Sequence, residues 1–215
     1  MPKRVLILLD DYWHPRHTIE PALPLILPAE EFDLSIVETV EEAQALPFAP
    51  DLIVNFKDGI ANTQIPTPNW YSSALAGQIL ALVEGGAGFL GIHCGLANIP
   101  DGNAVFTKVL KGRFLRHPPR CQVRFEPKGE HPILQGVEAF TAEDEHYMVE
   151  VLEAQTQVLG SNTSEHGTTI ALWAHALGRG RVAGVTPGHS TEVLCHPQYA
   201  KLLHNAAKWC AGLIW

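Results

Sequence analysis

The chain has 215 residues, of which 46% are hydrophobic and 18% are charged, and its formal net charge is −8. This composition excludes intrinsic disorder, and the length favours a single domain that spans 1–215. The acidic balance and the lack of any lysine or arginine run argue against nucleic acid as a partner, because binding phosphates requires clustered basic side chains.

The N-terminus and the cysteines indicate a cytoplasmic protein. The apolar run at 5–9 is too short for the apolar region of a signal peptide. No segment reaches the ~18 apolar residues that a membrane helix needs, so we expect no membrane partner. The four cysteines are scattered and form no C-x-x-C pair. This pattern favours free thiols in a reducing compartment over a disulfide framework.

Three apolar runs in the first quarter of the chain predict buried strands. The runs lie at 5–9, 34–37 and 51–56. Continuous apolar runs of this length are typical of strands that are buried on both faces of a parallel sheet. A proline-rich amphipathic stretch at 17–28 separates the first two strands.

A helix and a fourth strand follow. Ser72 or Ser73 can cap a helix that carries apolar residues on one face between 75 and 83. Gly85 and Gly86 end this helix, because glycine adopts the left-handed C-terminal conformation without steric cost. The strand is expected at 88–92. The alternation of strands and helices predicts an α/β fold with a doubly wound parallel sheet.

The second half of the chain is less regular. Short strands are expected at 121–126, 148–152, 157–160, 169–173 and 181–186. A last helix begins after Pro197, where apolar residues recur at helical spacing. The sequence contains no internal repeat, low-complexity tract or linker, which again favours one domain.

The most informative segment is a glycine-flanked turn after the fourth strand, Gly91-Ile92-His93-Cys94-Gly95. In a nucleophile elbow the central residue lies on a strained strand-to-helix turn, and the flanking glycines relieve crowding. The central residue here is His93. Cys94 comes one position later, so its side chain is expected to point away from the tip of the turn.

This segment resembles the ThuA-like (trehalose utilisation) family. The run 83–93 is similar to that family's helix, Gly-Gly, strand and Gly-x-His segment. Further blocks resemble the family in the same order along the chain: Arg16-His17; Gly112-Arg113-Phe114 with His117-Pro118; His131-Pro132-Ile133 with Gly136 and then Asp144-Glu145-His146-Tyr147; and Gly178 to Val182 followed by Gly188-His189. The blocks together span nearly the whole chain.

The resemblance implies a flavodoxin-like fold shared with class I glutamine amidotransferases, with a doubly wound, mainly parallel sheet and helices on both faces. It also implies a role in carbohydrate utilisation.

Glutaminase activity is not expected. Class I amidotransferases need a cysteine at the centre of the elbow and a His-x-Glu pair to activate it. This chain has His93 at the centre, and the late segment His196-Pro197-Gln198 carries glutamine where the carboxylate should be. A neutral amide cannot stabilise an imidazolium as a carboxylate does.

Three histidines follow predicted strands and define the candidate site. His17 comes after the first strand, His93 after the fourth and His189 after the strand at 181–186. The carboxyl ends of parallel strands meet at one edge, so these side chains can converge there. Histidine titrates near neutrality, which suits proton transfer. The alternative for each histidine is a capping or core-edge role.

The catalytic candidates are His93 and His189, with Asp144 or Glu145, from a polar loop at 144–146, tuning one of them. The candidate substrate contacts are Asp11, His17, Cys94, His117 and Tyr147. Trp13, Trp70 and Tyr147 could stack on a sugar ring or pack as ordinary core residues. His14, His166, His175 and His204 are expected to be solvated.

A divalent metal such as zinc is a separate candidate. Neutral imidazoles and a carboxylate can form an open catalytic zinc site, and His93, His189 and Glu145 would be the ligands. No H-x-x-x-H spacing supports this, so every ligand would come from a different loop.

Four functional hypotheses follow. The first is an enzyme that uses a histidine-lined pocket on a disaccharide or keto-sugar as a hydrolase, lyase or isomerase. The second is a non-catalytic carbohydrate-binding or regulatory protein, and the third is a metal-dependent hydrolase. The fourth is a cysteine-dependent protein that needs a reactive Cys94. The expected partner is a small carbohydrate, and a homodimer is considered because many proteins of this fold class dimerise.

Overall fold

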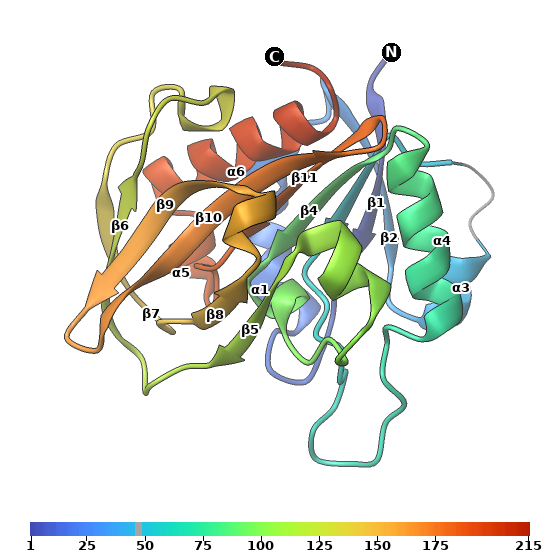
Figure 1. Ribbon diagram of the computed structural model, residues 1–215, viewed down its shortest axis with the longest axis horizontal. Helices are drawn as coiled ribbons and strands as arrows, with labels where there is room; N and C mark the ends of the chain where they lie inside the picture. Colours follow the sequence, from blue (N-terminus) through green and yellow to red (C-terminus); the bar gives the residue numbers. More distant parts are fainter. Residues whose placement is uncertain (46–48) are drawn as a thin grey trace.

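A computed structural model describes residues 1–45 and 49–215 as a layered α/β structure (Figure 1). Its main sheet has nine strands in the order β2-β1-β3-β4-β11-β10-β9-β6-β7, and β5 and β8 form a separate pair. The strands are β1 (Lys3–Leu8), β2 (Phe32–Val37), β3 (Leu52–Asn55), β4 (Gly88–Ile92), β5 (Gly112–Arg116), β6 (Cys121–Pro127), β7 (Phe140–Asp144), β8 (Met148–Val151), β9 (Gln157–Ser164), β10 (Gly167–Leu177) and β11 (Gly180–Val185). The α-helices are α1 (Arg16–Ile19), α2 (Leu23–Ile26), α3 (Val40–Gln44), α4 (Ser73–Glu84), α5 (Thr191–Leu194) and α6 (Pro197–Cys210).

The sheet has a parallel half and an antiparallel half. The pairings β2–β1, β1–β3, β3–β4 and β4–β11 are parallel. The pairings β11–β10, β10–β9, β9–β6 and β6–β7 are antiparallel. The α/β class is therefore confirmed, and the expectation of a mainly parallel sheet describes only the half from β2 to β11.

Helices cover both faces of the parallel half, which explains its continuous apolar strands. Along β1 and just beyond it, Val5, Ile7 and Leu9 pack on one face with α2 and α6. Leu6 and Leu8 pack on the other face with α4. Successive side chains of a strand point to opposite faces, so a strand covered on both sides must be apolar at every position.

The predicted helix boundaries agree with the structure. The Ser72 hydroxyl accepts a hydrogen bond from the Leu75 backbone N–H over 3.2 Å and caps α4. Gly85 follows the last residue of α4, and Gly86 has φ of +120°. Pro197 is the first residue of α6, where its missing N–H costs nothing.

Four elements were not predicted from the sequence: β5, β7, α3 and α5. Strand β7 reads Phe-Thr-Ala-Glu-Asp and forms the edge of the sheet, so it lacks the apolar pattern of a doubly covered strand. The expectation that Asp144 belongs to a polar loop is wrong, because Asp144 is the last residue of β7. Strands β9 and β10 also extend well beyond their predicted ends.

The topology brings four strand ends to one edge of the sheet. The parallel strands β1, β4 and β11 share one direction. Four successive antiparallel pairings separate β11 from β7, so β7 runs in the same direction as β11. The segments that follow β1, β4, β7 and β11 therefore leave the same edge. No helix in 1–45 or 49–215 is long and apolar enough to cross a membrane.

Candidate functional site

The turn after β4 has the strained geometry expected of an elbow. His93 begins the short helix η2 (His93–Leu96) with φ of +47°, a left-handed conformation that is uncommon for a residue with a side chain. A Cβ atom at Gly95 would lie 2.1 Å from the backbone oxygen of Asn55, so only glycine fits there. The turn holds the His93 side chain in a fully buried position over the strand ends.

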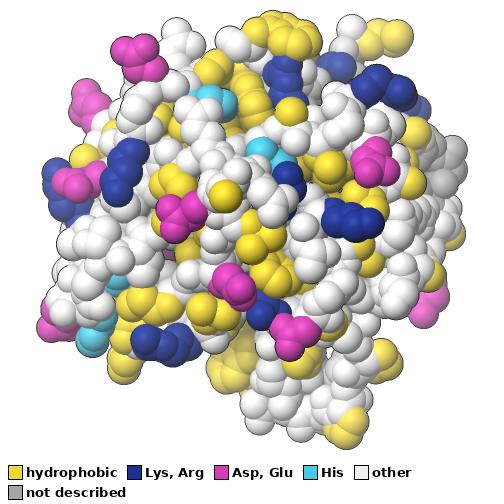
Figure 2. Space-filling model, in the orientation of Figure 1, with side chains coloured by type: hydrophobic (Ala, Val, Ile, Leu, Met, Phe, Trp, Pro, Cys, Tyr) yellow, Lys and Arg dark blue, Asp and Glu magenta, His cyan; other side chains and the backbone are white. Residues whose placement is uncertain are grey.

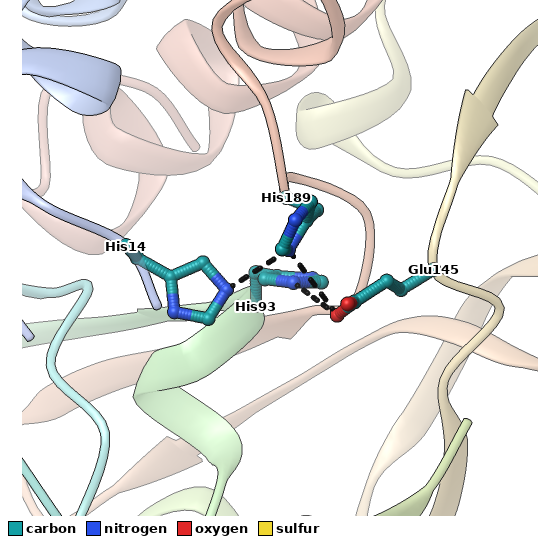
Figure 3. A group of neighbouring side chains, drawn as sticks. All are labelled: His14, His93, Glu145 and His189. Carbon is teal, nitrogen blue, oxygen red and sulfur yellow. Dashed lines mark hydrogen bonds and ion pairs between the residues drawn. The ribbon is translucent and has the colours of Figure 1, made fainter. Parts of the chain in front are cut away.

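Four side chains converge at this edge: His14, His93, Glu145 and His189, here called the histidine–glutamate cluster (Figure 3). Oε2 of Glu145 lies 3.3 Å from both Nε2 of His93 and Nδ1 of His189. Nε2 of His14 lies 3.2 Å from Nδ1 of His189. The four donor atoms all lie within 4.8 Å of one another.

Hydrogen bonds outside the cluster fix the orientation of two imidazoles. Nδ1 of His93 donates to the backbone oxygen of Thr186 over 2.8 Å. Nδ1 of His14 donates to Oδ1 of Asp11 over 3.0 Å. Carbonyl and carboxylate oxygens only accept, so both Nδ1 atoms carry hydrogen. When these rings are neutral, their Nε2 lone pairs face the centre of the cluster.

The electrostatics of the cluster favour a neutral His14 and an ionised Glu145. Burial lowers the pKa of His14 and outweighs the opposing hydrogen bond to Asp11. Burial would raise the pKa of Glu145, but the neighbouring rings of His189 and His93 outweigh burial and hold that pKa below its usual range. His14 is therefore available as a lone-pair donor, while Glu145 carries the negative charge.

Asp144 supports the cluster through backbone hydrogen bonds. Its carboxylate accepts hydrogen bonds from the backbone N–H groups of Gly188 at 2.8 Å and of His189 at 3.1 Å. The side chain thereby ties the end of β7 to the turn after β11. The predicted role of Asp144 beside a catalytic histidine is thus a positioning role.

A pocket of about 280 Å³ opens over the cluster. Its lining combines aromatic and polar side chains: Trp13, His14, Asp58, Thr63, Ala97, Asn98, Phe114, His117, Glu145 and Tyr147. The Tyr147 ring stacks on His93 with centroids 4.0 Å apart, and His117 Nε2 lies 3.6 Å from Oε1 of Glu145. Burial raises the pKa of Asp58 to about 6.

A larger open groove of about 1080 Å³ lies at the opposite edge of the sheet, beside the start of β1. Apolar side chains such as Leu23, Leu27 and Phe32 form much of its wall, and no histidine lines it. Because it lacks titratable groups suited to proton transfer near neutrality, the smaller pocket is the better candidate site.

The structure brings most of the predicted site residues together. His93, His189 and Glu145 belong to the cluster, and His117 and Tyr147 line the pocket. Asp11 contacts His14 from outside the cluster rather than lining the pocket.

Two residues predicted as substrate contacts lie outside the lining of the pocket. His17 lies on α1 with its side chain exposed to solvent, outside both the cluster and the pocket lining. Cys94 is buried, and its thiol donates to the backbone oxygen of Phe56 over 2.7 Å. The thiol also lies within 4.8 Å of donor atoms of Asp11 and His14, but burial raises its pKa well above the ordinary value and keeps it protonated.

His14 was missed by sequence reasoning. It was expected to be solvated, yet it is only 5% exposed and belongs to the cluster. The available signal was its spacing of three residues from Asp11, which lets one side chain reach the other. His175 and His204 are also half-buried rather than solvated, and burial lowers the pKa of His175 to about 4.

The segment that resembles an amidotransferase His-x-Glu pair has a structural role. His196 caps α6 by accepting a hydrogen bond from the Gln198 backbone N–H over 3.3 Å, and its ring stacks on Phe140. The Gln198 side chain accepts a hydrogen bond from the Glu138 backbone. Neither residue belongs to the cluster or to the lining of the pocket.

Fold and site together define an α/β protein with a histidine-rich pocket at the carboxyl edge of its parallel strands. The family model described as trehalose utilisation, ThuA, matches residues 4–210. The chain therefore belongs to the ThuA family. No curated protein matches the sequence.

Solved structures share the fold at low sequence identity. A ThuA-like protein from Parabacteroides merdae is 16% identical with a TM-score of 0.77, over 98% of this chain and 90% of that one. A ThuA-like protein from Bacteroides uniformis is 18% identical with a TM-score of 0.68, over 97% and 91%. A β-galactosidase from Bacillus circulans sp. alkalophilus is 12% identical with a TM-score of 0.63, over 95% of this chain but only 30% of its own. These likenesses support the fold alone.

Proposed function

We propose that this protein is an enzyme of carbohydrate utilisation that acts on a sugar or keto-sugar in the pocket above the histidine–glutamate cluster. The observation that carries the proposal is the convergence of three imidazoles and one carboxylate, of which His14 and Glu145 line a partly aromatic pocket. Aromatic faces pack on the C–H faces of a sugar ring, while polar groups hydrogen-bond its hydroxyls. The family description, trehalose utilisation, agrees with this substrate class.

The cluster suits proton transfer between neighbouring atoms of a bound sugar. His189 is the most exposed of the three imidazoles, and Glu145 contacts both His189 and His93. In the proposed roles His189 exchanges a proton with the substrate, and Glu145 orients His189 and stabilises the imidazolium. His93 serves as the orienting group of the acid–base set, because its ring is fully buried, is held by the Thr186 carbonyl and contacts Glu145. Such groups serve hydrolysis, elimination or isomerisation.

The size of the pocket bears on the substrate. Its volume of about 280 Å³ is at the small end of the ~300–1,000 Å³ found for ligand pockets. One sugar ring in the pocket, with the remainder of a disaccharide outside, fits this volume. Trp13 lines the pocket, Tyr12 packs edge-on against Trp13, and both are about half exposed. In the proposal these two rings contact the outer part of the disaccharide.

Glutaminase activity is not part of the proposal. The elbow carries His93 at its centre, the neighbouring Cys94 thiol is buried and protonated, and Gln198 stands where a carboxylate is needed. The thiolate required for attack on an amide is therefore not available.

We also propose a flavodoxin-like, doubly wound class for the parallel half, a single ThuA-like domain over 1–215, a cytoplasmic location and a homodimer. Two similar structures are titled cytoplasmic proteins from Salmonella typhimurium. On the face in Figure 2, lysine and arginine side chains are interspersed with acidic and hydrophobic ones, with a few close together near the top of the view. The net charge of −8 supports a small-molecule partner rather than a nucleic acid.

The test is turnover of a panel of disaccharides, monosaccharides and their keto derivatives by wild type and by His93→Ala. We expect a loss of at least ~100-fold in the variant, because general acid–base groups contribute about 10²–10⁴-fold. His17→Ala, whose side chain is exposed on α1, is the matched control and should keep wild-type turnover. Equal turnover in wild type and His93→Ala would remove His93 from the mechanism. Tight sugar binding without turnover would instead favour the non-catalytic carbohydrate-binding alternative.

A further inference from the structure

At the centre of the histidine–glutamate cluster, acceptor atoms outnumber N–H donors. His93 and His14 each use their Nδ1 hydrogen outside the cluster, on Thr186 and Asp11. Their neutral Nε2 atoms can then only accept, and so can the carboxylate of Glu145. Nε2 of His93 is buried, has no hydrogen-bond partner among the described residues and lies 3.3 Å from Oε2 of Glu145, so two acceptors face each other.

His189 cannot supply the missing hydrogens. Its Nδ1 lies 3.2 Å from Nε2 of His14 and 3.3 Å from Oε2 of Glu145, and it carries at most one hydrogen. One hydrogen satisfies one of these two contacts well. The other contact of His189 and the contact between His93 and Glu145 then lack a well-aligned hydrogen.

One cation at the centre would satisfy all four acceptors at once. In a tetrahedral zinc site with metal–ligand distances of about 2.0–2.1 Å, neighbouring donor atoms lie about 3.3–3.4 Å apart. Three of the six distances between donor atoms of the cluster are 3.2, 3.3 and 3.3 Å, and all six are at most 4.8 Å. Three imidazoles and one carboxylate suit zinc and similar transition metals, whereas magnesium and calcium prefer all-oxygen sites.

The residues around the cluster have the form of a supporting shell for such an ion. Asp11 holds His14 in a carboxylate–histidine pair, and the Thr186 carbonyl holds His93. Metal-binding histidines almost always donate their other ring N–H to such a partner, which fixes the ring and its tautomer. Asp144 holds the backbone of His189 and of Glu145.

We propose that the cluster binds one divalent transition-metal ion, best matched by zinc, through Nε2 of His14, Nε2 of His93, Nδ1 of His189 and Oε2 of Glu145. Glu145 and His189 are the ligands with solvent-exposed side-chain surface, and Glu145 also lines the pocket. A fifth coordination position on that side can take an oxygen of a sugar hydroxyl or carbonyl, because zinc accepts five ligands. The ion therefore deepens the proposed function at the same site, although its binding does not require a sugar.

The test is metal binding by the full-length protein after removal of metal with a chelator and without any sugar. Titration calorimetry with Zn²⁺ should give one site per chain, and Co²⁺ should give the visible absorption of a tetrahedral N/O site. Glu145→Gln and His93→Gln should each weaken Zn²⁺ binding by at least ~100-fold. Asp11→Asn keeps every ligand but loses the support of His14, and it should weaken binding by about 10–100-fold.

His166→Ala is the matched control, because His166 lies beside Glu165 in an exposed histidine–glutamate pair and should bind Zn²⁺ like wild type. Circular dichroism and thermal unfolding would verify that each variant folds, and Asp11→Asn tests the proposal if His93→Gln does not fold. Failure of the wild type to take up Zn²⁺ or Co²⁺ would overturn the metal site, as would equal binding by Glu145→Gln or Asp11→Asn. Metal binding without sugar turnover would support the metal site and contradict the proposed function. Sugar turnover by a protein that binds no metal would support the proposed function and contradict the metal site.

Discussion

Nδ1 of His93 donates to the carbonyl oxygen of Thr186, and this 2.8 Å hydrogen bond joins the turn after β4 to the end of β11. The Thr186 hydroxyl in turn accepts a hydrogen bond from the Asn162 amide on β9. The orientation of the central imidazole is thus set by two neighbouring strands and reinforced by a third. Such a ring is preorganised before any ligand arrives.

Gly95→Ala should strongly destabilise the protein. The added Cβ would lie 2.1 Å from the Asn55 backbone oxygen, and backbone atoms on both sides of the turn must shift to make room. We expect a loss of about 3 kcal/mol or more in the free energy of unfolding, measured by urea titration. Gly77→Ala on the exposed face of α4 meets no atom within 4 Å and should stabilise by about 0.5–1 kcal/mol. Similar effects for the two substitutions would contradict the close packing of this turn.

Lys57→Met should also destabilise the protein, because the Lys57 ammonium links three strand ends. It is buried and donates to the backbone oxygens of Leu9, Asp10 and Glu38. Methionine keeps most of the volume but leaves these carbonyls without their donor. We expect a loss of about 2–3 kcal/mol in urea titrations.

The control for Lys57 is Lys201→Met. The exposed Lys201 ammonium donates to a single backbone oxygen, that of Gly136, so its loss should cost about 0.5 kcal/mol or less. A Lys57→Met variant as stable as this control would show that water replaces the ammonium at the three carbonyls.

Asp58→Asn should stabilise the protein increasingly as the pH rises. Burial raises the pKa of Asp58 from 3.8 to about 6 in the folded state. The folded state then binds this proton more tightly than the unfolded state. The resulting stability is fully present below pH 3.8 and is lost as the pH rises through about 6.

Asparagine stays neutral, so the variant avoids this loss. Its stability relative to wild type should rise by about 2 kcal/mol between pH 4 and pH 7, measured by urea titration across that range. Asp33→Asn on the exposed side of β2 is the control and should show little change in relative stability. A flat difference for Asp58→Asn would mean that Asp58 is hydrated in the folded protein.

Cys94 should resist alkylation in the native protein. Its thiol is buried, donates to the Phe56 carbonyl and has a raised pKa through burial, so little thiolate forms. Iodoacetamide at pH 8 followed by peptide mass spectrometry should label the half-buried Cys121 first and Cys94 only after unfolding. Rapid labelling of native Cys94 would revive the hypothesis of a cysteine-dependent function.

The sequence revealed the parallel half of the fold because that half is buried on both faces. Runs such as Val5 to Leu9 are apolar at every position, and their ends can be recognised without a structure. His93 and His189 follow such ends and were therefore found. The antiparallel half was harder, since edge strands such as β7 alternate buried and exposed residues and contain charges.

His14 could not be identified from the sequence because its position depends on a local turn. The Asp11 carboxylate accepts hydrogen bonds from the backbone N–H groups of Trp13 and His14, and these bonds fold the segment back toward the sheet. A polar stretch of this kind has the sequence pattern of a solvated loop, because its burial depends on strand ends that are distant in the sequence. The pairing of strands is likewise not encoded in the apolar pattern of any one strand.

The cluster draws one residue from beside the edge strand β7 and three from beside the parallel strands, so both halves of the sheet must be assembled before it exists. Anything that binds there binds only the assembled state and raises the free energy of unfolding by RT ln(1 + [L]/Kd). Occupancy should therefore slow hydrogen exchange in β7 and in β1 together, although seven strand pairings separate these two strands in the sheet. A small molecule bound at the cluster would therefore stabilise the parallel and the antiparallel halves of the sheet together.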